Sequence, residues 1–177
     1  MKVMYKNLNI FSFIVLFFLL FGCKDGLVNF NIDFTQETTI PASTPINTPI
    51  DILTPETTTN TEQELEVRDS RKNLVEHVFL EVLTIEITSP ENQNFNFLKE
   101  MEIFINSENN NEERIAFIKD IPEGSKKLEC EVLDIDLQKY LLEDQFKLRV
   151  KTVTNQLITQ DVDIEIFTEF NISAKVI

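Results

Sequence analysis

Apolar and polar residues alternate along much of the chain, with the period of two that is typical of strands buried on one face. The alternation is clearest in the segments 28–34, 101–105, 128–132, 146–153 and 158–172. Turn-forming residues separate these segments, and apolar residues at helical spacing mark a short segment at 136–142. About seven strands without intervening helices predict an all-β fold, a single antiparallel sandwich of two sheets with one short helix. From the strand count alone, we expect an immunoglobulin-like arrangement.

The apolar phase changes within one continuous segment of this pattern. Apolar residues occupy even positions from Val78 to Val82 and odd positions from Leu83 to Ile87. One extra residue in a strand produces such a change, because it moves the following side chains to the other face. The alternative is a central strand that is buried on both faces. Further along, the polar stretch 107–112 separates two apolar runs that we expect to pair as a hairpin.

Charged residues near the end of the chain suggest how two strands could pair. Lys147, Arg149 and Lys151 lie on the polar face of one strand, and Asp161, Asp163 and Glu165 lie on that of the next. Antiparallel pairing of Lys151 with Asp161 would oppose unlike charges on one face and apolar residues on the other. The sequence therefore predicts that these two strands are hydrogen-bonded neighbours.

Residues 41–62 form a Pro- and Thr-rich segment that holds four of the six prolines in the chain. Proline cannot donate a hydrogen bond to a sheet and favours extended backbone in its neighbours. The segment is either a semi-rigid stalk or an extended arm that packs along the edge of the domain. We favour the arm, since a stalk has little use for the apolar residues Ile46, Ile50, Ile52 and Leu53.

The first residues carry a different pattern from the rest of the chain. Lys2 and Lys6 precede an apolar run, 10–21, which is followed by Gly22 and Cys23. A basic start, an apolar run of this length and a small residue before a cleavage point are the parts of a secretory signal. The run is shorter than the ~20 residues of a membrane-spanning helix.

Leu20-Phe21-Gly22-Cys23 resembles the lipobox of bacterial lipoproteins. This resemblance implies that residues 1–22 are a signal peptide that is removed and that Cys23 is diacylated. Residues 23–26 would then form a lipidated tether, followed by the sandwich domain at 27–177. The implied partner is a bacterial membrane, reached through the lipid at Cys23, and we expect the outer membrane. Lys24-Asp25 is similar to part of the export signal of some surface lipoproteins, which leaves the face of the membrane open.

The charge of the chain limits its partners. The formal net charge is −14, and Lys2 and Lys6 are the only charged residues before Cys23, so the remaining chain carries −16. Nucleic acids attract clustered Lys and Arg, so we do not expect a nucleic acid as partner. Fifteen Phe and no Trp predict a core that is filled by phenylalanine.

Residues with the potential for catalysis or metal binding are few. His77 is the single histidine, and no serine lies in a nucleophile elbow, so a catalytic triad is not expected. Cys130 lies on the apolar face of its strand, which predicts a buried thiol with no disulfide partner if Cys23 is acylated. The pattern offers neither a zinc site nor a calcium loop, and we expect no cofactor, no metal and no catalytic residue.

Two functional classes remain open at this point. The first, which we favour, is a noncatalytic binding or structural module of the cell envelope with a protein or glycan as ligand. The second is a small envelope hydrolase that uses surface carboxylates, such as those at 134 and 136 or at 161, 163 and 165. Because catalytic carboxylates need a cleft, the shape of the surface around them distinguishes the two classes.

Overall fold

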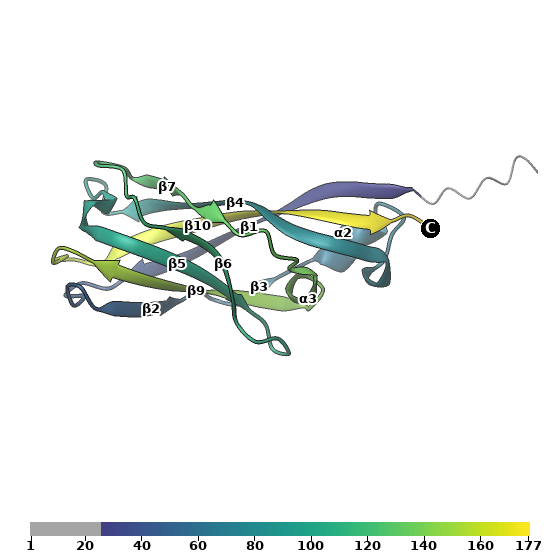
Figure 1. Ribbon diagram of the computed structural model, residues 1–177, viewed down its shortest axis with the longest axis horizontal. Helices are drawn as coiled ribbons and strands as arrows, with labels where there is room; N and C mark the ends of the chain where they lie inside the picture. Colours follow the sequence, from purple (N-terminus) through teal and green to yellow (C-terminus); the bar gives the residue numbers. More distant parts are fainter. Residues whose placement is uncertain (1–25) are drawn as a thin grey trace, which may run out of the picture.

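The computed structural model describes residues 26–177, so the signal peptide and Cys23 lie outside the described residues. Ten strands form two antiparallel sheets that pack face to face (Figure 1). One sheet has the order β1 (Leu27–Ile40), β10 (Val162–Lys175), β4 (Val75–Ser89) and β7 (Lys127–Glu129). The other has the order β2 (Pro49–Leu53), β9 (Gln145–Thr154), β5 (Leu98–Asn106), β6 (Glu113–Ile118) and β8 (Glu131–Val132), with β3 (Thr57–Thr58) also paired to β9.

The helices of the described chain are short. They are α2 (Thr61–Glu66), α3 (Gln138–Leu141) and the two single 3₁₀ turns η1 (Lys72–Leu74) and η2 (Phe95–Phe97). The predicted all-β antiparallel sandwich of two sheets is therefore confirmed. The predicted number of about seven strands is too low, because β3 has only two residues and because the alternating segment 128–132 is divided between β7 and β8.

The strands pair in a nested order. β1 pairs with β10, β2 with β9, β4 with β7, and β5 with β6, so the chain runs like a long hairpin folded over into two sheets. This is the winding of a jelly roll. It differs from the predicted immunoglobulin-like arrangement, whose sheets have the strand orders A-B-E-D and C-F-G. In that arrangement the first strand pairs with the second at the edge of its sheet, whereas β1 here pairs with the last strand, β10. Alternation in a sequence tells which side chains face inward, but it does not say which strand lies alongside.

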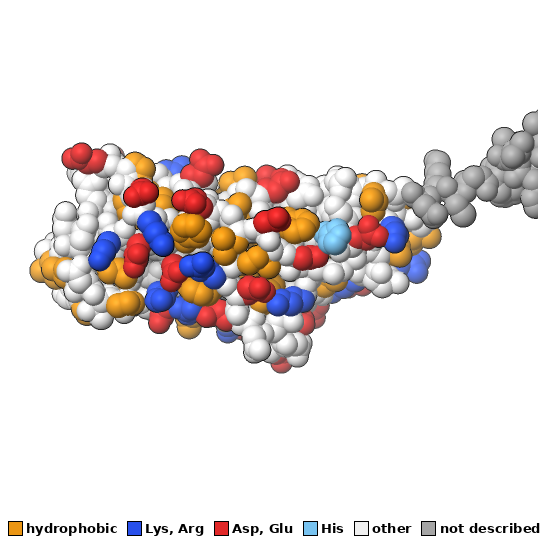
Figure 2. Space-filling view, viewed as in Figure 1, with side chains coloured by type: hydrophobic (Ala, Val, Ile, Leu, Met, Phe, Trp, Pro, Cys, Tyr) orange, Lys and Arg blue, Asp and Glu red, His pale blue; other side chains and the backbone are white. Residues whose placement is uncertain are grey.

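The predicted pairing of the last two strands is wrong. β9 and β10 lie in different sheets, and the chain crosses between them at residues 155–161. Lys147, Arg149 and Lys151 instead meet acids on and around β2, β5 and β6, in the pairs Lys147–Glu56 (3.4 Å), Arg149–Glu112 (2.6 Å) and Lys151–Glu102 (3.3 Å). In Figure 2, acidic and basic side chains lie intermixed over the area of β5 and β6. Charge complementarity did not identify the neighbouring strand, because acids on several strands could pair with the same cations.

Two local predictions hold in the structure. The register between β10 and β4 shifts where Glu169 pairs with Val82 and Phe170 with Leu80, which leaves Glu81 as an extra residue in β4. This is the bulge that the change of apolar phase predicts. The hairpin is also found, since Met101 to Ile105 pair with Glu113 to Ile118.

Phenylalanine joins the two sheets at the centre of the core. Phe34 of β1, Phe146 of β9 and Phe170 of β10 pack edge to face, with ring centroids 5.1 to 6.1 Å apart. Phe95 and Phe97 are also buried. Much of the remaining core consists of isoleucine from both sheets, so phenylalanine fills only part of it.

Candidate functional site

The two lateral edges of the sandwich differ in how they are closed. On one side, β7 ends at Glu129 and β8 begins at Glu131, so the chain steps from one sheet to the other through Cys130. The Cys130 amide donates to the Leu83 carbonyl (2.9 Å), and the side chain is 6% exposed. Burial raises the pKa of the Cys130 thiol to about 12, so the group is neutral at physiological pH. The continuous chain closes this edge, and Cys130 is buried as predicted.

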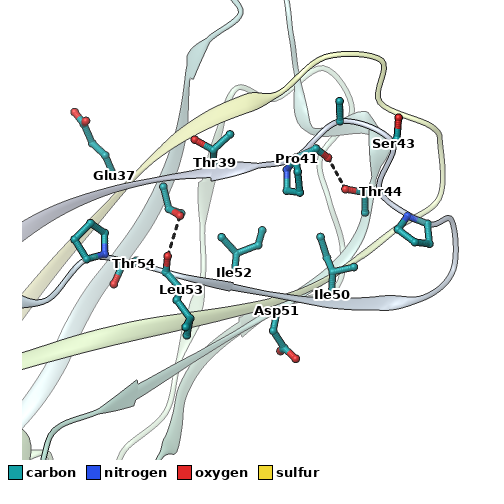
Figure 3. A pocket seen from close by; sticks show the side chains of 14 residues that line it. Glu37, Thr39, Pro41, Ser43, Thr44, Ile50, Asp51, Ile52, Leu53 and Thr54 are labelled. Atoms are coloured by element: carbon teal, nitrogen blue, oxygen red, sulfur yellow. Dashed lines mark hydrogen bonds between the residues drawn. The ribbon is translucent and has the colours of Figure 1, made fainter.

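On the opposite side, β1 and β2 are the edge strands of their sheets and face each other across a groove of about 720 Å³ (Figure 3). Within the described residues, no backbone-to-backbone hydrogen bond joins β1 to β2. A single side-chain bond crosses the groove, from the Thr38 hydroxyl to the Leu53 carbonyl (3.2 Å). Beyond the groove, Gln36 donates to the Thr57 hydroxyl (2.5 Å) and closes the space between β1 and β3. Two strand edges are thus left open side by side.

The wall of the groove follows from the alternation along β2. Ile50 and Ile52 point from β2 toward β1, whereas Asp51 and Leu53 point away from it (Figure 3). Ile52 is buried and Ile50 is half-buried. The groove therefore has an apolar wall flanked by strand backbone, a combination that suits an extended chain with alternating side chains.

The turn between β1 and β2 is fixed to the loop between β9 and β10. The Ala42 amide donates to the Asp161 carboxylate (2.7 Å), and the Ser43 amide donates to the Ile158 carbonyl (2.9 Å). Within the turn, the Thr44 hydroxyl donates to the Pro41 carbonyl (2.5 Å). These bonds hold the end of the groove in place, so the groove is formed before any ligand arrives.

The groove and its rim carry acidic charge. Glu37 and Asp51 are its only charged lining residues in the part of the chain that the structure describes. Asp51 pairs with Arg149, and Glu37 stands opposite Glu165, which in turn stands opposite Glu86 on the outer face of the same sheet, where Glu86 pairs with Lys127 (3.3 Å). Like charges directly opposite each other on a sheet are unfavourable, and a cation placed there would relieve the repulsion.

Three of the five predicted carboxylates have structural partners. Asp161 accepts from the turn amide described above, Asp163 accepts from the Thr39 hydroxyl (2.7 Å), and Asp134 is exposed. Asp136 bonds to His77 Nδ1 (2.8 Å) and accepts from the amides of Val78 and Gln138. Burial favours the neutral form of Asp136, but these hydrogen bonds outweigh burial and lower its pKa. His77 is itself exposed and stacks against Phe79.

The shifted carboxylates do not have the properties of a general acid. Glu76, Glu102 and Asp136 are the described carboxyl groups with a resolved shift, and the pKa of each is lowered. The hydrogen bonds from Lys175 to Glu76 and from Arg114 to Glu102 are the main causes in the first two. A carboxylic acid that donates a proton at neutral pH needs a raised pKa. None of the three residues lines the groove.

Residues 26–177 contain neither a metal centre nor a membrane-spanning helix. No group of three or more His, Cys, Asp or Glu side chains there is placed to hold a metal ion. No helix in this range has the length and apolar character to cross a bilayer. The groove was missed by the sequence analysis, although the prolines at 41, 45 and 55 that line it had marked the segment as unusual.

Comparisons with known proteins leave the chain without a family. No family model matches it, and no curated protein matches it. Among solved structures, one of Desmodium yellow mottle tymovirus is 11% identical, covers 86% of this chain and 91% of its own, and has a TM-score of 0.27. One of turnip yellow mosaic virus is 13% identical, covers 82% of this chain and 96% of its own, and has the same TM-score of 0.27. Similarity at this level carries no argument about function.

Proposed function

We propose that this chain is a lipid-anchored protein of the bacterial cell envelope, held in the outer membrane by acyl groups on Cys23. Its β-sandwich is a noncatalytic binding module, and the groove between β1 and β2 takes up an extended segment of a partner protein. The observation that carries this proposal is the pair of open strand edges that face one apolar, acidic groove.

Open strand edges favour a protein segment as the ligand. An edge strand has unpaired N–H and C=O groups, which an extended chain can satisfy by adding one more strand. Alternate side chains of such a segment would contact Ile50 and Ile52, which are themselves two residues apart. No aromatic ring lines the groove among the described residues, whereas sugar rings usually bind by stacking on aromatic rings. A protein segment therefore fits better than a glycan.

The charge of the groove specifies the segment further. Of the two acids that line it, Asp51 points away from β1 and pairs with Arg149, so Glu37 is the acid left without an ion pair, and no Lys or Arg lines the groove within residues 26–177. A segment with Lys or Arg next to its apolar strand residues would be attracted, and an acidic segment would be repelled. Opposite potentials of this kind mainly affect the association rate and the choice of partner.

The proposed anchor and the groove lie at opposite ends of β1. β1 begins next to Gly26, and the groove begins ten residues further on at Glu37. At about 3.4 Å per residue, this separates the groove from the start of the domain by about 35 Å. An anchored domain would therefore hold the groove away from the membrane, where a partner can reach it.

The envelope hydrolase is the weaker alternative. It requires two carboxyl groups in a cleft, one of them with a raised pKa. The acids considered for this role are exposed or bonded to neighbouring backbone and hydroxyl groups, and the groove contains no such pair. No observation favours the hydrolase over the binding module.

A peptide library tests the module. Twelve-residue random peptides displayed on phage would be selected on the purified chain, and we expect enriched peptides with alternating apolar residues and Lys or Arg. Ile50→Lys places a cation in the groove, so it should lower the affinity for the selected peptides about tenfold. This corresponds to about 1.4 kcal/mol of binding free energy. Val67→Lys, at a residue that is 75% exposed outside the groove, is the matched control and should leave affinity unchanged. If no peptide is selected, or if both variants lose affinity equally, the proposal that the groove binds a peptide is contradicted.

Labelling with radioactive palmitate tests the anchor separately. Cys23→Ala removes the thiol that would carry the acyl group, so we expect no label and no cleavage of the signal peptide. Equal labelling of the variant and the unmodified chain would contradict the anchor. This outcome would not affect the conclusion about peptide binding in the groove.

A further inference from the structure

We propose that the end of the sandwich nearest Gly26 rests on the lipid bilayer, with Leu27, Val67 and Ile177 inserted at the level of the headgroups. This inference rests on the proposed lipid anchor at Cys23. It assigns a second binding surface to the domain, and its partner is the lipid surface itself.

Three exposed apolar side chains gather at this end. Leu27 is 59% exposed, Val67 is 75% exposed and Ile177 is 72% exposed, although each is large and apolar. The chain segments that carry them are joined by hydrogen bonds from the Val176 amide to the Gly26 carbonyl (3.0 Å) and from the Ile177 amide to the Asp69 carbonyl (2.9 Å). In Figure 1, the start of β1, the end of β10 and α2 lie at the same end of the molecule.

The short link to Cys23 brings this end to the membrane. Gly26 follows Cys23 by three residues, and three extended residues span at most about 10 Å. Acyl groups on Cys23 would lie in the bilayer, so the domain could not be more than this distance from the headgroups. Amphipathic helices that lie on a membrane bury their apolar face about 5 to 10 Å into this boundary region. The link is therefore short enough to bring the apolar side chains of this end to the boundary region.

The charges at this end indicate that apolar contact, rather than attraction to anionic lipid, would hold it there. The Arg68 guanidinium bonds to Glu64 (2.6 Å) and lies over the Phe30 ring (4.2 Å). Lys175 bonds to Glu76 (2.6 Å). Around Ile177, the acids Glu62, Glu66 and Asp69 are exposed and outnumber the bases Arg71 and Lys72. Clusters of unpaired Lys and Arg are the usual mark of binding to anionic lipids. We therefore expect contact with a neutral bilayer and no gain in contact from anionic lipid.

The lack of tryptophan in the chain allows a direct test. Val67→Trp creates a single reporter at the proposed contact, and Leu157→Trp is the matched control at the far end, where Leu157 is 59% exposed in the loop between β9 and β10. The lipidated full-length protein, extracted from membranes, would be placed in phosphatidylcholine vesicles whose acyl chains carry bromine, which quenches nearby tryptophan. We expect about twofold quenching for Val67→Trp and almost none for Leu157→Trp, with similar values when phosphatidylglycerol is added.

The possible failures can be told apart by flotation of the same vesicles. If the protein floats with the vesicles but Val67→Trp is not quenched, or if both reporters are quenched equally, the bilayer contact is wrong and the anchor stands. If the protein does not float, both the anchor and this inference are overturned. Ile177→Trp provides a second reporter at the contact should Val67→Trp fail to fold.

Discussion

The edge formed by β7 and β8 exposes little strand backbone, whereas the edge formed by β1 and β2 exposes much more. β7 and β8 have three and two residues, and the chain joins them directly through the buried Cys130. β1 has 14 residues and β2 has five, and no backbone hydrogen bond in the described chain links one to the other. Proteins usually shorten or cover edge strands, because an open edge can pair with another chain. The open edge is therefore where the binding module proposed above would take up a strand.

The open edge also carries features that limit nonspecific pairing. Prolines at 49 and 55 bound β2 and have no N–H to donate, and Asp33 and Glu37 place negative charge on β1. Proline and charge on an edge disfavour its pairing with a second copy of the same chain. The acidic rim would still admit a segment that carries Lys or Arg. These features of the open edge fit the selective binding proposed above.

Removal of the whole open edge should have the largest effect. A chain that starts at Glu62 lacks β1, β2 and β3, and with them the buried residues Ile32, Phe34 and Ile40. Each such side chain contributes about 1.5 to 3 kcal/mol on burial, and β10 would lose one of its two neighbouring strands along 14 residues. We expect no cooperative unfolding in urea for this chain, measured by circular dichroism, and a cooperative transition for one that starts at Lys24. Matching transitions would show that residues 24–61 are a stalk outside the fold.

A single core substitution should have the next largest effect. Phe34→Ala removes a ring that packs against both Phe146 and Phe170, and it should lower the free energy of unfolding by about 3 to 5 kcal/mol. Phe117 is only half-buried, with the Arg114 guanidinium over its ring, so Phe117→Ala is the matched control. Urea denaturation of both variants is the measurement. A smaller loss for Phe34→Ala than for Phe117→Ala would contradict a core centred between β1, β9 and β10.

The closed edge predicts a smaller, pH-dependent effect. The pKa of Cys130 is about 12 in the folded protein and near 9.0 when the thiol is free, so the unfolded chain loses this proton first as the pH rises. The unfolded state then binds fewer protons, and the free energy of unfolding should fall by about 1 kcal/mol between pH 9 and pH 10.

Cys130→Ala isolates this effect from other titrating groups. We expect the variant to lose stability less steeply over the same pH interval, and the native thiol of the unmodified protein to resist labelling at pH 8. Equal slopes for the two proteins, or rapid labelling of the native thiol, would show that the closed edge opens easily.

The closed edge also shows what the sequence could reveal and what it could not. Alternation correctly placed Leu128 and Cys130 on the inside, because the inward phase of a strand is a local property of the sequence. It suggested one strand through Val132, whereas the structure places Leu128 in one sheet and Val132 in the other. The change of sheet depends on which strands lie alongside, and these contacts join residues far apart in the sequence.

The same reasoning explains the missed groove. Ile50 and Ile52 could be recognised as apolar residues of a packed arm, but their position opposite β1 follows from the nested strand order. That order was not predictable, since the cations of β9 pair with acids on and around several other strands and with none on β10. Cys23 lies outside the described residues, so its acylation stays a prediction.

Hydrogen exchange measured by mass spectrometry tests the central claim most directly. The chain would be labelled in deuterated water with and without a peptide selected from the library. If the open edge accepts a strand, the peptide should slow exchange in residues 37–45 and 50–54 and leave residues 127–132 unchanged. Slowed exchange at 127–132 without any change at the groove would contradict the account.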